Sequence, residues 1–314
     1  MRDPATHQTD VYTDLSSLVR LKYQASGFSY LPAQPTRSVL SGRKRSRLRG
    51  RGLDFDELRH YRPGDDIRNM DWRVTNRTGK PHVRVYTEER DRPVLIVVDQ
   101  RLPMFFGSVS KMKSVVAAEL AALTAWRVLS VGDRAGAILF NDDMEVEFRA
   151  QRSERHLLTW LGKLAKMNND LSVAPGHNSD SSRLLSALKL LERRVGHDYL
   201  VIIISDFYGW DDDTLKIIKR VNRHNDIICS MVYDPLESNI SSAQSLVVSD
   251  GHYQLEIDPA RHDLGEKFEA SFNSSVARVR NELKRHRIPV LPISTATPVT
   301  EQLHEQLGGH RPLQ

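Results

Sequence analysis

The alternation of apolar and polar residues predicts buried strands and amphipathic helices from Pro93 onward. Val94–Val98 is a run of five apolar residues, four of them β-branched, and Asp99 follows it directly. Tyr199–Ser205 is a second apolar run, followed by Asp206. Short, continuous apolar runs are typical of strands buried on both faces of a parallel sheet.

The rest of this region repeats the same alternation of helices and strands. Helical spacing predicts helices at Asp14–Ala25, Lys111–Ser130 (capped by Ser108 or Ser110), Ser153–Leu164, Ser182–Arg194, Thr214–Arg223, Asp263–Arg287 and Val299–Leu307. Apolar runs predict strands at Ala135–Phe140, Met144–Phe148 (antiparallel, at the edge), Ile227–Tyr233, Tyr253–Ile257 and Ile288–Ile293. The predicted fold class is therefore α/β: a doubly wound, mostly parallel sheet with helices on both faces.

The residues before this domain follow a less regular pattern. Leu53–Leu58 is expected to form a short helical turn, and Asp71–Thr75 and His82–Glu88 alternate like half-exposed strands around a turn at Thr78–Gly79. We therefore expect two parts, a small β-rich or irregular segment over residues 1–92 and the α/β domain over residues 93–314.

Composition narrows the class of protein. Apolar residues at 39% and charged residues at 27% describe an ordinary globular chain, and the single cysteine, Cys229, excludes an internal disulfide. No apolar run approaches the roughly 20 residues that cross a bilayer, and the first ten residues lack the apolar core of a signal peptide. These features predict a cytoplasmic protein with no membrane span.

The positive charge of the chain, formally +5, is concentrated in one acid-free loop. Such a loop can bind nucleic acid, but no aromatic residue is interleaved there for base stacking. We therefore favour an exposed loop that docks on an acidic surface and keep nucleic-acid binding as the alternative. The basic loop comprises Arg43, Lys44, Arg45, Arg47, Arg49 and Arg51, preceded by Arg37.

Sequence motifs for catalysis are missing. The turn after the first strand has no GxGxxG, no GxxxxGK[ST] occurs, and neither GxSxG, HExxH nor paired CxxC is present. The twelve histidines are scattered. We therefore expect a protein that is not an enzyme and has no cofactor. Two carboxylates remain, because Asp99 and Asp206 would meet where strand order reverses, and at about 4 Å they would repel by roughly 4 kcal/mol. A positive group must lie between them.

One segment carries a specific resemblance. Its fixed positions are Arg59, Tyr61, Pro63, Gly64, Asp65, Asp66, Arg68, Asp71 and Trp72, within RHYRPGDDIRNMDW. This signature resembles that of the bacterial family catalogued as "domain of unknown function 58", and the likeness covers roughly residues 37–308. The resemblance implies a von Willebrand factor type A-like domain and partnership with a MoxR-type AAA+ ATPase in chaperone-like assembly or maturation. The signature is either a binding surface or a clasp between the N-terminal part and the sheet, and we favour the clasp.

Type A domains often hold Mg²⁺ in a metal-ion-dependent adhesion site with the motif D-x-S-x-S. Asp99 and Asp206 match its two acids, and Ser182 could stand for its threonine, but the two serine positions hold Arg101 and Pro103. The site is therefore expected to be degenerate: Mg²⁺ is disfavoured, and Arg101 supplies the positive charge. We expect a non-enzymatic adaptor that docks through Asp99, Arg101, Pro103, Phe105, Phe106, Ser182 and Asp206, with Mg-dependent ligand binding as a further alternative.

Overall fold

The computed structural model of the chain describes residues 11–30, 53–88, 92–172, 179–238, 246–249, 254–257 and 262–308. The basic loop at residues 43–51 lies outside these ranges. The chain divides into two compact units, one formed by Met1–Ala33 with Arg92–Gln314 and the other by Gln34–Asp91.

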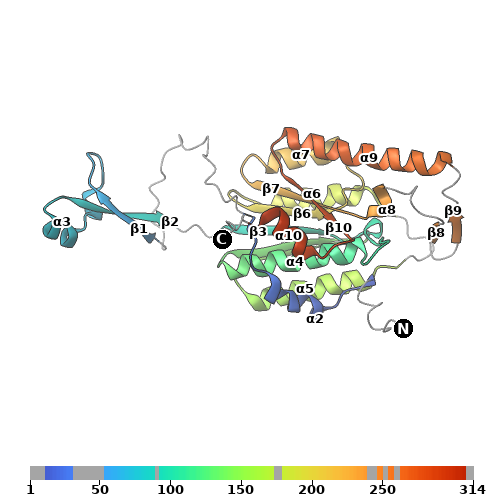
Figure 1. Ribbon diagram of the computed structural model, residues 1–314, viewed down its shortest axis with the longest axis horizontal. Helices are drawn as coiled ribbons and strands as arrows, with labels where there is room; N and C mark the ends of the chain where they lie inside the picture. Colours follow the sequence, from blue (N-terminus) through green and yellow to red (C-terminus); the bar gives the residue numbers. More distant parts are fainter. Residues whose placement is uncertain are drawn as a thin grey trace, which may run out of the picture. The chain divides into compact units, whose positions relative to one another are not determined.

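The large unit is built on a six-stranded sheet in the order β10-β7-β6-β3-β4-β5 (Figure 1). Neighbouring strands are parallel except β4 and β5, which pair antiparallel at one edge. Strand order reverses between β3 and β6, so the predicted doubly wound fold class is confirmed, together with its antiparallel edge strand. The strands are β3 (Pro93–Asp99), β4 (Arg134–Phe140), β5 (Glu145–Gln151), β6 (Leu200–Ser205), β7 (Asp226–Tyr233) and β10 (Val290–Ser294).

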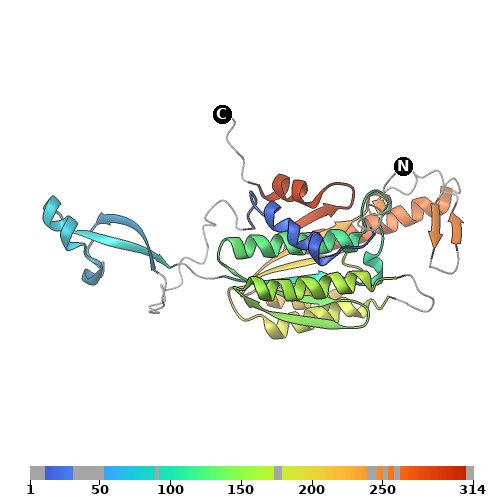
Figure 2. The same cartoon turned by 90° about the horizontal axis from the view of Figure 1, so that it is seen from below.

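Helices cover both faces of the sheet, because alternate residues of each buried strand point to opposite sides. On β3, Val94, Ile96 and Val98 belong to one core and Leu95 and Val97 to the other. The first core is covered by α2 (Leu15–Arg20), α4 (Lys113–Ser130), α5 (Glu154–Asn169) and α10 (Val299–Leu307). The second is covered by α6 (Ser182–Arg194), α7 (Asp212–Val221) and α9 (His262–Arg285). Figure 2 shows α2, α4 and α5 side by side on one face.

Shorter elements complete the large unit. They are the 3-10 turns η1 (Leu21–Gln24) and η3 (Leu102–Met104), the single turn α8 (Pro235–Ser238), and the hairpin of β8 (Leu246–Ser249) with β9 (Gln254–Ile257). No helix in the described ranges has both the length and the apolar character needed to cross a membrane.

The helix α2 belongs to the large unit and packs on α4 and α5. Leu18 has no exposed surface, and the Trp126 indole donates a 3.0 Å hydrogen bond to the Leu18 carbonyl oxygen. The Thr13 amide donates to the Asn168 side chain at 2.8 Å. The compact units thus differ from the expected division at residue 92, because the apolar face of α2 is buried against α4 and α5.

The small unit is an antiparallel pair, β1 (Leu53–His60) with β2 (His82–Glu88), joined through η2 (Ile67–Asn69) and α3 (Trp72–Thr78). Two predictions here are wrong: Leu53–Leu58 is a strand, and Asp71–Thr75 leads into a helix. The Asp71 carboxylate caps α3 by accepting hydrogen bonds from the amides of Arg73 and Val74 at 3.0 and 3.1 Å, which favours the helix.

Candidate functional site

The reversal of strand order brings the carboxyl ends of β3 and β6 together. The two strands are direct neighbours, with Val98 opposite Ile204. The chain leaves β3 toward α4 on one face and leaves β6 toward α7 on the other, so the two connections diverge at this point. Asp99 and Asp206 both lie at this point.

Arg101 places an internal positive charge between the two strand ends. Its side chain has no exposed surface, and its guanidinium donates to Asp99 through Nε at 2.9 Å and Nη2 at 2.6 Å. Nη2 also lies 3.8 Å from Asp206 Oδ1. The Asp99 carboxylate accepts further hydrogen bonds from the Arg101 amide at 3.0 Å and the Ser205 hydroxyl at 2.6 Å. The planar guanidinium thus joins the two strand-end acids.

A second buried cation, Lys113, was not predicted. It begins α4, its side chain is 2% exposed, and its Nζ donates to Asp206 at 3.0 Å and to Glu237 at 2.6 Å. Asp206 therefore lies between two cations, and a chain of alternating charges runs from Asp99 to Glu237. We call Asp99, Arg101, Lys113, Asp206 and Glu237 the strand-end cluster.

Burial and pairing act on these groups in opposite directions. Burial lowers the pKa of Arg101 and of Lys113, but the neighbouring carboxylates outweigh burial and raise both values above normal. For Asp206, burial raises the pKa, and Lys113 and Arg101 outweigh it, so the pKa is lowered. For Glu237 burial dominates, and the pKa is raised. Arg101, Lys113 and Asp206 are therefore charged at neutral pH.

Asp234 anchors the loop that leads into α4. Its carboxylate accepts hydrogen bonds from the Ser108 amide at 2.9 Å, the Ser108 hydroxyl, and the Thr295 hydroxyl at 2.6 Å. Ser110 donates to the Thr295 carbonyl oxygen at 2.6 Å. The predicted capping of α4 by Ser108 or Ser110 is therefore wrong, because both hydroxyls bind the ends of β7 and β10.

Aromatic rings cover the two cations on the solvent side. The Tyr208 ring lies 6.0 Å from the Arg101 guanidinium carbon and is 50% exposed, while the Phe106 ring lies 5.9 Å from Lys113 Nζ and is 37% exposed. Val109, 64% exposed, lies in the same loop as Phe106. We call Phe106, Val109 and Tyr208 the strand-end rim.

The remaining predicted docking residues have different surroundings. Phe105 is half-buried and stacks on Tyr12 with ring centroids 5.5 Å apart, and Pro103 is half-buried in η3. Ser182 is exposed at the start of α6, and its amide donates a hydrogen bond to the Asp180 carboxylate at 2.9 Å. This bond does not connect Ser182 to Asp99 or Asp206. Asp99 and Arg101 lack exposed surface and cannot touch a partner directly.

The donor set at the strand ends does not fit a divalent cation. Both oxygens of Asp99 already accept hydrogen bonds from Arg101, and a guanidinium repels Mg²⁺. Among the residues that the structure describes, no group of three or more His, Cys, Asp or Glu side chains is placed to hold a metal ion.

The signature segment is held together by its own acids. Arg59 and Asp65 form a two-pronged ion pair at 2.8 and 2.8 Å, and Asp66 caps η2 through the Arg68 amide at 3.0 Å. Asp71 accepts from Arg84 Nε at 2.8 Å in addition to capping α3.

Three further signature positions shape its turn and its surface. The Tyr61 amide donates to the Pro81 carbonyl oxygen at 2.9 Å, and Gly64, after Pro63, has a φ of +103°, which favours glycine. Trp72 is 60% exposed.

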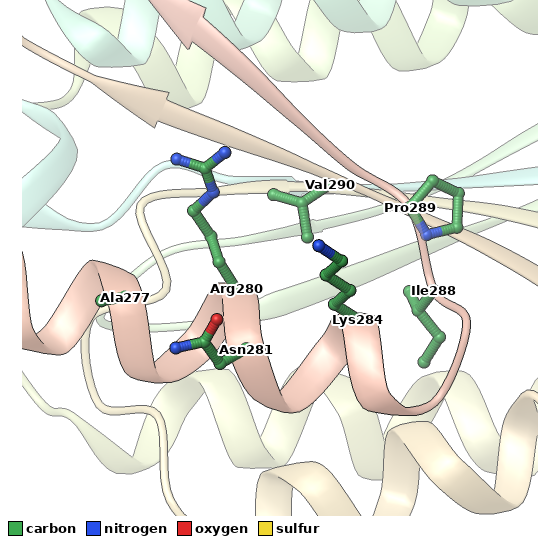
Figure 3. A pocket seen from close by; sticks show the side chains of 7 residues that line it. All are labelled: Ala277, Arg280, Asn281, Lys284, Ile288, Pro289 and Val290. Carbon is green, nitrogen blue, oxygen red and sulfur yellow. The ribbon is translucent and has the colours of Figure 1, made fainter.

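A hollow of about 350 Å³ lies elsewhere, between α9 and the start of β10 (Figure 3). Arg280, Asn281 and Lys284 of α9 line it together with Val290. Val290 is the first residue of a strand parallel to its neighbour, so this hollow is at the opposite end of the sheet from the strand-end cluster.

Fold and site together define a doubly wound α/β protein whose strand-end acids are neutralised by cations of its own chain. The model of the family "Protein of unknown function DUF58" matches residues 57–278, and the chain belongs to this family. That range contains the whole signature from Arg59 to Trp72 and most of the α/β domain, as the resemblance indicated.

Relatives are found in mycobacteria. The uncharacterized proteins Rv1480 of Mycobacterium tuberculosis and Mb1516 of Mycobacterium bovis are each 30% identical over 244 residues, which cover 76% of this chain and 75% of the relative.

Similar solved structures include the conserved hypothetical protein BatB from Bacteroides thetaiotaomicron, with a TM-score of 0.34 and 13% identity over 62% of this chain and 98% of that chain. They also include the SpRpn10 VWA domain, with a TM-score of 0.39 and 12% identity over 69% of this chain and 95% of that domain.

Proposed function

We propose that this chain is a non-enzymatic protein-interaction adaptor that docks a partner at the strand-end rim without a bound metal ion. The observation that carries the proposal is Arg101, which is fully buried and paired with Asp99 where a cation would otherwise be needed. The site is thus a degenerate metal-ion-dependent adhesion site. A partner carboxylate has no metal to bind there, so recognition must use other groups.

The strand-end rim supplies those groups. Phe106, Val109 and Tyr208 expose apolar and aromatic surface in the loops that follow β3 and β6, and aromatic residues of this kind are enriched at protein interfaces. The buried cations act indirectly, since Arg101 and Lys113 lie under the rings of Tyr208 and Phe106 and stabilise their positions.

Catalysis is not part of the proposal. Each charged group of the strand-end cluster is paired with another, so none is left as a free acid, base or nucleophile. The family resemblance favours a MoxR-type AAA+ ATPase as the partner, in chaperone-like assembly or maturation of a client protein.

The test is binding of the full chain to the MoxR-type ATPase of the same organism, measured by biolayer interferometry with and without EDTA. We expect unchanged affinity in EDTA. We also expect about 30-fold weaker binding for Phe106→Ser/Tyr208→Ser, because truncating two central aromatic contacts typically has effects of this size.

Tyr23→Ser is the matched control, since Tyr23 is 87% exposed on η1 of the same unit. Binding that disappears in EDTA would contradict the metal-free interface. Equal affinities for the rim variant and the control would contradict the rim as the docking surface.

A further inference from the structure

The net positive charge of the chain comes from the residues of the small unit. Residues 34–91 contain fifteen Lys and Arg against nine Asp and Glu, a net charge of +6, whereas the whole chain has +5. The large unit is therefore close to neutral, with a net charge of −1. Residues 37–51 carry seven of these fifteen cations and no acid, whereas residues 53–88 contain seven Lys and Arg against seven Asp and Glu. On the described part of this unit, residues 53–88, a polyanion would therefore be attracted by the local arrangement of cations and not by net charge.

Two acids of the signature form ion pairs with two of the arginines of the small unit. Asp65 is taken up by Arg59, and Asp71 by Arg84 and the first turn of α3. Within the described part of the chain, a set of exposed basic side chains forms no ion pair. These are Arg62, Arg68, Arg73, Arg77 and Lys80.

The exposed face of α3 combines these cations with an aromatic ring. At 100° per residue, Trp72, Asn76, Arg73 and Arg77 occupy one continuous arc of the helix, and all four are exposed. Val74, on the opposite side of α3, is half-buried within the small unit. The Trp72 side chain is 60% exposed, as is that of Ile67 in the preceding turn. An indole this exposed is accessible to a planar ligand, and Arg73 and Arg77 lie on the same arc of the helix.

We propose that this face of the small unit binds single-stranded nucleic acid, with Trp72 stacking on a base and Arg73 and Arg77 contacting phosphates. Stacking on an exposed ring requires a base that is not already stacked in a duplex, which selects single strands. The helix α3 carries two exposed arginines and no acid, which favours a polyanion over a protein surface, whose charges alternate in sign. This proposal concerns the small unit and is independent of the strand-end rim.

The proposal can be tested by fluorescence anisotropy of the full chain with three labelled probes: 20-nucleotide oligo(U), 20-nucleotide oligo(dT) and a 20-base-pair DNA duplex. We expect single strands to bind more tightly than the duplex at 50 mM NaCl. Trp72→Ala should weaken single-strand binding about ten-fold, whereas Trp72→Phe, which keeps a stacking ring, should recover most of it.

The phosphate contacts can be measured separately, through the dependence of the binding affinity on salt concentration. Arg73→Glu/Arg77→Glu should reduce the slope of log affinity against log salt by about 1.4, because each phosphate contact on a single strand contributes about 0.7. Tyr23→Ala and Arg155→Glu/Lys189→Glu are matched controls on the large unit, where these side chains are exposed, and should bind like wild type.

Two results would overturn the proposal. One is the absence of binding to either single strand at 20 mM NaCl with 50 µM protein. The other is equal binding of duplex and single strand with no response to Trp72→Ala, which would leave only non-specific charge attraction. Loss of ATPase binding on Trp72→Ala, together with no oligonucleotide binding, would assign the surface to a protein partner instead.

Discussion

Replacing Arg101 by methionine should destabilise the large unit strongly. The substitution keeps most of the side-chain volume but removes the cation that pairs with Asp99, whose carboxylate has no exposed surface. Asp206 keeps Lys113 at 3.0 Å, so one buried charge, and not two, loses its partner. Removing one member of a buried ion pair typically costs about 3–5 kcal/mol, and we expect roughly 4 kcal/mol.

The measurement is urea unfolding at pH 7 followed by tryptophan fluorescence. Because the small unit can unfold separately, the experiment uses a Trp72→Phe background, which leaves Trp126, Trp160 and Trp210 to report the large unit alone. Arg101→Met should shift the midpoint by about 4 kcal/mol divided by the urea m-value.

A second substitution distinguishes the lost pair from a general packing defect. Asp99→Asn/Arg101→Met removes both charges and keeps an oxygen at position 99 for the Ser205 hydroxyl. This variant should be at least about 2 kcal/mol more stable than Arg101→Met. A single variant within about 1 kcal/mol of wild type, or a double variant no more stable than the single one, would refute the reasoning.

Three further predictions concern individual contacts. Ser205→Ala removes one buried hydroxyl with two hydrogen bonds and should lower the free energy of unfolding by about 2 kcal/mol, measured in the same urea assay. Gly209→Ala should cost about 2 kcal/mol or more, because φ is +82° and a Cβ would lie 2.3 Å from the Ser181 carbonyl oxygen; an unchanged midpoint would contradict this. The Asp65 carboxyl, held by the Arg59 guanidinium, has its pKa lowered to about 2, so its stabilising effect is complete above about pH 4 and lost as the pH falls toward 2. Carbon NMR titration of Asp65 should give a midpoint near 2, and a midpoint near 4 would exclude the ion pair.

The sheet and the meeting of its two acids could be predicted because both follow from short-range patterns. Continuous β-branched runs identify buried strands, and each run is followed by the acid of interest. Parallel pairing then places Asp99 and Asp206 at one edge. Arg101 is two residues from Asp99, so its role also follows from local sequence.

The rest of the site depends on contacts between distant segments. Lys113 and Glu237 are 124 positions apart, and no periodicity relates them. The residues around Asp234 and Glu237 form no pattern in the sequence that indicates a partner for either acid. Tyr208 was missed because a loop aromatic next to Asp206 gives no indication that it covers a buried guanidinium.

The errors in the small unit have the same origin. A two-stranded pair is weakly specified by local propensity, and its pairing decides the structure. Leu53–Leu58 lacks a strong strand pattern but pairs with β2. Asp71 reads as part of an alternating segment, yet its carboxylate satisfies the first amides of α3 and starts a helix there.

The central claim is that a guanidinium of the chain takes the place of a bound ion at the strand ends. It is tested most directly by titrating the full-length protein with Mn²⁺ and counting bound ions by electron paramagnetic resonance. We expect no stoichiometric binding at 1 mM Mn²⁺. This concentration is close to the Kd of the weakest extracellular Ca²⁺-binding modules. One ion bound per chain, lost on Asp99→Ala, would contradict the account.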